Sequence, residues 1–253
     1  MKKFSIFSLA AVIILFSACQ KEPDPFVSNV SDKVISYTED VTSVSGGYHS
    51  VTTYNISYDA NNRVVSIVSA TNNGDKFLLA YPAANKYTLD LYNMNTLSIH
   101  EDFFLTSDSF LDSAFQYNDT QDSSTEKYFY NSNKQLIKMN EYDYSIVSGS
   151  ILNNSTSYVY NNEGDLITTT DSFKNIDTYE YFSNLSYALP VIIGPPNSTA
   201  NKKSHLVKKH TLTSNGSFVG SADFTYTFDS SDRISTEKAL INDGSIVIKT
   251  YQY

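Results

Sequence analysis

The sequence has no tryptophan, one cysteine, nine glycines and six prolines in 253 residues. Because Cys19 is the single cysteine, a disulfide within the chain is excluded, and no cluster of thiols is available to ligate a metal ion. The glycines form no phosphate-binding loop, and the sequence contains no G-x-S-x-G nucleophile elbow. These absences argue against nucleotide-binding enzymes with such loops and against serine hydrolases with such an elbow.

Charge is also low, at 18% of residues, and mostly acidic, with a formal net charge of −9. Such a chain is not a general polyanion binder, so we expect no nucleic-acid partner. Hydrophobic residues make up 41% of the sequence, and this proportion argues against global disorder. The length fits one sizeable β domain or two small ones.

Residues 1–18 have the layout of a secretory signal peptide. Lys2 and Lys3 precede an uncharged, mostly apolar run, residues 4–18, which ends in small side chains. This run is shorter than the roughly 20 apolar residues that a transmembrane helix needs, and no other stretch approaches that length. Loss of the two lysines with the signal would take the formal net charge from −9 to −11.

Residues 15–19, Leu-Phe-Ser-Ala-Cys, resemble the bacterial lipobox. The resemblance implies lipidation of the Cys19 sulfur, cleavage before Cys19, and anchoring in a lipid bilayer by acyl chains alone. Residues 19–32 then contain Pro23, Pro25 and mixed charge, so we interpret them as an extended tether. The charged start of the tether also resembles the export signals of Bacteroidetes lipoproteins, which imply the outer face of the outer membrane. An ordinary solvated tether is the alternative.

Tyrosine and phenylalanine are abundant, with 20 and 15 residues, and aromatic residues favour strands. Five segments share one pattern. A large apolar residue precedes an aromatic anchor by two positions, a turn residue follows the anchor, and the chain is apolar again six positions after it. The segments are 56–65, 79–88, 128–137, 158–167 and 226–235, with anchors Tyr58, Tyr81, Tyr130, Tyr160 and Phe228. Each segment predicts a β-hairpin.

These hairpins predict a single all-β domain over residues 33–253, an antiparallel meander that curls into a barrel-like or strongly twisted sheet. The first strand is expected at 34–37 and the last at 246–253. Residues 101–115 could form an amphipathic helix, but serines and aspartates interrupt the apolar stripe, so we expect strands there. Three prolines and a glycine predict a long loop near 189–203.

The repeated unit, aromatic-x-aromatic-[DN] with a second apolar strand after the turn, resembles the YD repeats of Rhs-type shells. The whole chain resembles the uncharacterised β-rich lipoproteins of Bacteroidetes. That resemblance rests on the lipobox, the repeated units, the proline loop followed by Lys208 and Lys209, and the closing residues Tyr251-Gln252-Tyr253. The family implies a curled antiparallel meander and no particular activity.

Histidines and carboxylates give little sign of a catalytic or metal centre. His205 and His210 are five residues apart, and alternation along a strand would place them on opposite faces, which suits zinc poorly. We therefore expect no metal site, no cofactor, and a domain that folds without a metal ion. Paired carboxylates for glycoside hydrolysis stay open, because 27 acidic residues allow many pairs.

Two features could bind a partner. Lys202, Lys203, Lys208 and Lys209 gather beside the proline loop of an acidic protein. The alternative is a solvated loop and a strand edge that lysine protects from aggregation. The surplus tyrosines could bind sugars or proteins, although core packing is the simpler interpretation.

We therefore expect a membrane-anchored envelope lipoprotein that is not an enzyme and acts as a binding or interaction module. Its partner would be a glycan or an envelope protein. A structural envelope protein without a small ligand is the first alternative, and a glycan hydrolase is the second. The expected location is the outer membrane, at the cell surface rather than the periplasmic face.

Overall fold

The structure is a computed structural model. It describes residues 33–253 apart from five short gaps, which are residues 45, 73, 118–122, 146–148 and 188–203. The expected signal peptide, Cys19 and the tether lie outside the described residues. The expected loop at 189–203 lies outside them too, together with Lys202 and Lys203, so the interpretations of these segments stay predictions.

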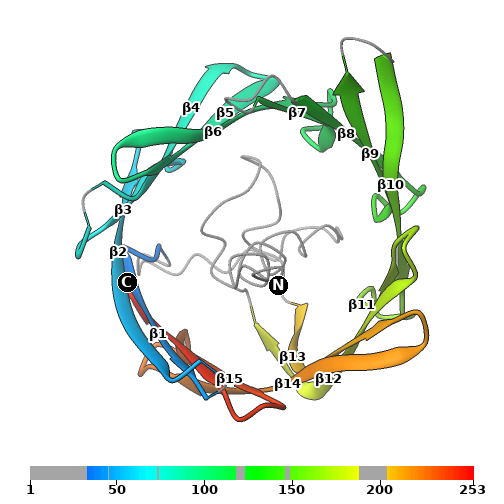
Figure 1. Cartoon of the computed structure of the whole chain (residues 1–253). Helices are drawn as coiled ribbons and strands as arrows, with labels where there is room; N and C mark the ends of the chain where they lie inside the picture. The colour runs from blue at the N-terminus through cyan, green and yellow to red at the C-terminus, as the bar shows by residue number, and fades with distance from the viewer. Residues whose placement is uncertain (1–32, 45, 73, 118–122, 146–148, 188–203) are drawn as a thin grey trace.

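Sixteen antiparallel strands form one closed barrel, which Figure 1 shows as a ring. Each strand pairs with its neighbours in sequence, and β1 also pairs with β16, so the sheet has no free edge. The strands are β1 (Ser36–Ser43), β2 (Tyr48–Tyr58), β3 (Val64–Ser69), β4 (Lys76–Ala83), β5 (Lys86–Asn93), β6 (Thr96–Leu105), β7 (Leu111–Tyr117), β8 (Ser123–Tyr130), β9 (Leu136–Ser145), β10 (Gly149–Tyr160), β11 (Leu166–Thr170), β12 (Asn175–Tyr187), β13 (Ser204–Ser214), β14 (Ser217–Phe228), β15 (Ile234–Ile241) and β16 (Ile246–Gln252).

The predicted all-β antiparallel meander is confirmed, and of the two shapes left open the structure shows the closed barrel. Residues 101–115 belong to β6 and β7 with a turn between them, so the strand interpretation is confirmed there. Among the described residues, no helix is long and apolar enough to cross a membrane.

Four of the five predicted hairpins have turns with the same hydrogen-bond pattern. In the first, the Oδ1 atom of Asp59 accepts hydrogen bonds from the backbone N–H groups of Asn61 and Arg63, both at 2.9 Å. Asn62 then adopts a φ of 64°, which a short polar side chain tolerates. The other three turns repeat these bonds from Asn131, Asn161 and Asp229, with positive φ at Lys134, Gly164 and Asp232. The segment after Tyr81 differs, because β4 and β5 pair directly at Ala83 and Lys86 and leave a two-residue turn.

The barrel contains three further anchors that the sequence pattern missed. Leu105 occupies the anchor position before the β6–β7 turn, where Thr106 Oγ1 accepts the backbone N–H of Phe110 at 3.1 Å. The pattern required an aromatic residue and therefore passed over this leucine. Tyr181 is followed by more strand instead of a turn, and Tyr253 is the last residue, so neither shows the complete pattern.

One face of the barrel wall is buried and the other is exposed. Figure 1 shows no strand outside the ring, so a large apolar side chain that is almost fully buried must face the interior. The residues two positions before the eight anchors are buried or partly buried, and all of them except Leu79 pack in two apolar clusters. They are Ile56, Leu79, Phe103, Tyr128, Tyr158, Tyr179, Tyr226 and Tyr251. Since side chains alternate along a strand, the positions between them face outward.

The end of β12 and the start of β13 lean from the wall into the barrel (Figure 1). Their pairing is interrupted there, with Tyr181 opposite Val207 and then Ser186 opposite His205. Leu206 is 0% exposed and belongs to the same apolar cluster as Ile56. Burial of Leu206 fixes the backbone at the start of β13, next to His205.

Candidate functional site

The anchor tyrosines tie neighbouring strands together at the end of the barrel that carries the repeated turns. In each tie, the phenolic hydroxyl donates a hydrogen bond to the carbonyl oxygen of an apolar residue, which is the first residue of the adjacent strand or, for Val34, lies two residues before it. The pairs are Tyr58 with Val34 (2.7 Å), Tyr81 with Val64 (2.9 Å), Tyr160 with Leu136 (3.0 Å), Tyr181 with Leu166 (2.6 Å) and Tyr253 with Ile234 (3.0 Å). The rings are distributed around the barrel and do not converge on one point, which supports the core-packing interpretation of the tyrosines.

Further along the inner face lies a group of carboxyl side chains. Glu126 and Glu141 are direct cross-strand partners on β8 and β9, and Tyr128 donates a hydrogen bond from its hydroxyl to Glu126. Burial raises the pKa of Glu101 on β6 to about 7, and repulsion from Glu126 adds to the effect. Burial likewise raises the pKa values of Glu126 and Glu141. The interior therefore carries acids that resist ionisation.

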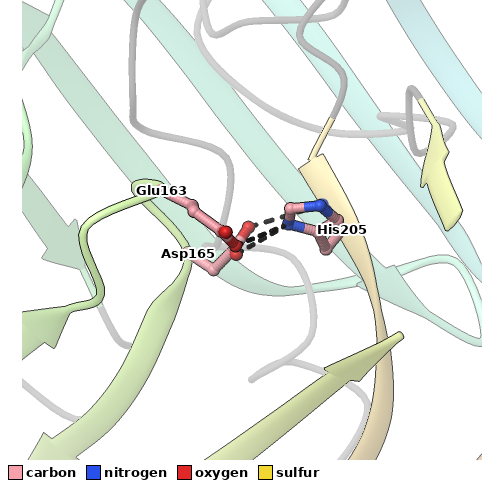
Figure 2. Close-up of side chains that lie close together, drawn as sticks. All are labelled: Glu163, Asp165 and His205. Carbon is pink, nitrogen blue, oxygen red and sulfur yellow. Dashed lines mark hydrogen bonds and ion pairs between the residues drawn. The ribbon is translucent and has the colours of Figure 1, made fainter. Parts of the chain in front are cut away.

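Glu163, Asp165 and His205 form a compact cluster of possible metal ligands (Figure 2). The Nδ1 atom of His205 lies 2.8 Å from Oδ2 of Asp165 and 3.6 Å from Oε2 of Glu163. One ligand atom from each residue lies within 4.8 Å of the other two. Asp165 is 6% exposed, whereas the Glu163 side chain is 69% exposed, so the cluster has one buried acid and one accessible acid.

The turn that carries these acids positions them without needing their charge. The Oδ1 atom of Asn161 accepts the backbone N–H groups of Glu163 (3.0 Å) and Asp165 (2.8 Å), and its amide donates to Asp165 Oδ2 at 3.0 Å. The sister turn after Tyr130 makes the same three bonds with neutral Asn133 and Gln135. The acids are therefore an addition to a turn that the repeat already supports.

The other histidines of the chain also bond to aspartates. His49 bonds to Asp40 at 3.0 Å, His100 bonds to Asp90, and His210 bonds to Asp177 at 2.7 Å. The ring of His210 also stacks on Tyr179, with centroids 4.9 Å apart. The simple alternation that we applied to His205 and His210 does not hold, because a register shift between Glu180 and Tyr181 interrupts the β12–β13 pairing.

The predicted lysine patch is only partly described. Lys208 is exposed, and Lys209 lies 4.0 Å from Asp223 on the neighbouring strand and opposite Glu180. For Lys208 and Lys209, the strand-edge part of the alternative is wrong, because β13 has a paired neighbour on each side. For Lys202 and Lys203 the solvated loop stays a prediction.

The outer face of the wall carries charged side chains in the middle of several strands, beside exposed apolar ones such as Phe129, Val159 and Leu240. Alternation from the buried positions places charged side chains outward on at least seven strands. They are Asp90, Asp102, Lys127, Glu180, Lys209, Asp223 and Lys238. Lys86 also pairs with Asp102 on this face at 2.9 Å.

The fold is similar to that of two solved structures from Bacteroides. A porin-like protein from Bacteroides uniformis ATCC 8492 aligns with a TM-score of 0.61 and 11% identity, over 87% of this chain and 96% of the other. A porin-like protein from Bacteroides vulgatus ATCC 8482 aligns with a TM-score of 0.59 and 13% identity, over 87% of this chain and 98% of the other. The chain shares the fold of these barrels. No protein-family model and no curated protein matches the sequence.

The two Bacteroides structures are consistent with the expected resemblance to β-rich Bacteroidetes proteins. The His205 cluster, in contrast, escaped the sequence analysis, because Asp165 and His205 are 40 residues apart. One signal was available. The turn after Tyr160 has two acids, whereas the turn after Tyr58 has Asn61 and Arg63 at the same positions.

Proposed function

We propose that the protein is a lipid-anchored envelope lipoprotein whose barrel stands in water and serves as a non-enzymatic binding or interaction module. The observation that carries the proposal is the charged outer wall. A lysine on the lipid-facing side of a membrane barrel costs about 2–4 kcal/mol at the bilayer midplane. Lys127, Lys209 and Lys238 all lie on outward-facing strand positions, so a bilayer is a poor surrounding for this wall.

The anchor would be supplied by Cys19 instead of by the strands. Acyl chains hold a protein at a bilayer without any polypeptide in the hydrocarbon, provided that about two chains are attached. The lipobox at residues 15–19 and the tether at 19–32 fit this arrangement. The outer membrane, at the cell surface, remains the proposed location.

The interior is the proposed binding surface. Sixteen strands enclose far more space than the eight that side chains alone can fill. Beyond the packed ring of anchors, the inner wall presents polar groups such as Asp177 and His210 beside the ring of Tyr179. Aromatic faces next to hydrogen-bonding groups suit a glycan or a protein loop. Glu126, one of the acids with a raised pKa, accepts a hydrogen bond from the Tyr128 hydroxyl, and this supports a structural part for it over a catalytic one.

Replacement of the anchor tests the proposal directly. The Cys19→Ala variant, exported through a cleavable non-lipoprotein signal, is expected in the soluble fraction without detergent, while the wild type stays with the membrane. A variant that remains in the membrane after high-salt and alkaline washes would show that the barrel itself spans the bilayer, as the name porin-like suggests for its structural relatives.

The binding role needs a separate measurement. The soluble variant is applied to an array of envelope and dietary glycans, and any glycan bound is then incubated with the protein and analysed for cleavage products. Binding without turnover supports the module. Release of shorter products would instead make the protein a glycan hydrolase.

A further inference from the structure

We propose that Glu163, Asp165 and His205 bind a divalent transition-metal ion of the zinc class, which links the β10–β11 turn to the start of β13. The proposal does not depend on the binding role of the barrel. It rests on the mutual placement of three side chains from two segments that β12 separates in the sheet.

The ligand atoms converge closely enough to share one ion. Zinc binds imidazole nitrogen and carboxylate oxygen at about 2.0–2.2 Å. The Nδ1 atom of His205 lies 2.8 Å from Asp165 Oδ2 and 3.6 Å from Glu163 Oε2. Figure 2 shows the three side chains pointing toward one another. Opening of the Asp165–His205 contact by a few tenths of an ångström would admit the ion, and rotation of the exposed Glu163 would complete the set.

The surroundings hold two of the ligands in place. Asp165 is fixed by the amide of Asn161 and by its own backbone N–H, which Asn161 accepts. His205 is fixed from the backbone, since Leu206 next to it is fully buried. Preorganised ligands with hydrogen-bonded partners raise metal affinity. Glu163, by contrast, is accessible and can close over an ion that arrives from water.

The chemistry of the set selects the class of ion. Imidazole suits zinc, copper, iron and nickel, whereas magnesium and calcium prefer sites made only of oxygen. Three protein ligands leave one tetrahedral position open for water or for another oxygen donor.

The comparison with the sister turns argues that the acids are specific to this place. The turn after Tyr130 keeps the same hydrogen bonds with Asn133 and Gln135, so folding of the turn does not require Glu163 or Asp165. Of the four described turns of this form, the one with acids at both positions is also the one whose acids contact a histidine.

Zinc titration of the metal-free mature protein tests the proposal. The protein carries no tag, and Cys19 is lipidated or replaced by serine so that no thiol competes. We expect one saturable zinc site by isothermal titration calorimetry and a rise in Tm of several degrees at saturation, because an ion that binds only the folded state stabilises it. Magnesium and calcium at the same concentrations should produce neither effect.

Glu163→Gln is the decisive variant, because its side chain is exposed and its removal leaves the turn intact. We expect its zinc affinity to fall at least tenfold while its metal-free Tm stays within about 2 °C of the wild type. His205→Gln should abolish the site. His49→Gln, which removes another histidine–aspartate pair, is the matched control and should bind zinc like the wild type. Absence of saturable binding at about 100 μM zinc, or wild-type affinity in Glu163→Gln, would overturn the proposal.

Discussion

The hydroxyl of Tyr160 donates a 3.0 Å hydrogen bond to the carbonyl oxygen of Leu136, across the boundary between β10 and β9. The hairpin that joins these two strands lies at the opposite end of the barrel. The bond therefore links β9 and β10 at the end of the barrel where no hairpin joins them. Four further tyrosines repeat this tie around the barrel.

Removal of the tie should have a measurable cost. Tyr160→Phe is expected to lower the free energy of unfolding by about 1 kcal/mol, because it loses one hydrogen bond and keeps the ring. Tyr160→Ala should cost more, up to the roughly 3–5 kcal/mol of a fully buried aromatic, since a cavity is added. Urea unfolding followed by circular dichroism measures both. The exposed Tyr117 provides the control, and Tyr117→Phe should unfold like the wild type.

Tyr130 should behave in the same structural way. Its ring packs on Phe110 with centroids 5.4 Å apart, and burial raises the pKa of its hydroxyl to about 12. Tyr130→Ala is therefore expected to unfold at lower urea concentration. A variant that unfolds like the wild type and yet loses a bound glycan would make the aromatic ring the working surface instead.

The side chain that begins each repeated turn should also contribute to stability. Asn131 accepts two backbone N–H groups through its side-chain oxygen, so Asn131→Ala should destabilise by about 1–2 kcal/mol, with two donors left to water or unpaired. Asn131→Asp should cost far less, because the sister turns place Asp59 and Asp229 at the same position. Equal losses in the two variants would mean that the shared turn chemistry is not what stabilises this hairpin.

The buried carboxyl groups predict how stability depends on pH. The pKa of Glu101 is 4.5 ordinarily and about 7 in the folded protein. At pH values between 4.5 and 7, the folded state binds more protons than the unfolded state. The contribution of Glu101 to stability is therefore greatest below about pH 4.5 and is lost as the pH rises toward 7. The shift in the pKa of Glu101 corresponds to a loss of at most roughly 3 kcal/mol in the free energy of unfolding. Urea unfolding between pH 5 and pH 8 measures the loss.

Glu126→Gln identifies the origin of that loss. Glutamine keeps an acceptor for the Tyr128 hydroxyl and removes the charge whose repulsion adds to the effect of burial on the pKa of Glu101. The variant should therefore gain stability relative to the wild type at pH 8 and differ little from it at pH 5. A variant that is less stable than the wild type at both pH values would show that the carboxylate of Glu126 stabilises the fold.

The orientation of the wall can be read by cysteine labelling. A Lys238→Cys substitution places a thiol on the outward face of β15, whereas Ala222→Cys places one at an inner, buried position of β14. In membrane-bound protein, a charged, membrane-impermeant maleimide should label position 238 rapidly and position 222 slowly. Protection of position 238 that is lost on addition of detergent would show that lipid covers the wall.

The sequence alone determined the fold class and most of the repeated unit. Tyr58, Tyr130, Tyr160 and Phe228 were identified as anchors because local chemistry shapes each unit. A polar side chain starts the turn, a residue with positive φ ends it, and alternation assigns the faces. These are interactions between residues close in the chain, so the printed sequence is enough to recognise them.

Only the tertiary structure shows the features that depend on contacts between residues far apart in the sequence. The pairing of β1 with β16 chose the closed barrel over the open sheet, because hydrogen bonds between the two ends of the chain leave no trace in local pattern. The same holds for the contact of Asp165 with His205, which 40 residues separate. A register shift in β12–β13 and the inward lean of these strands bring them together, and neither can be derived from alternation alone.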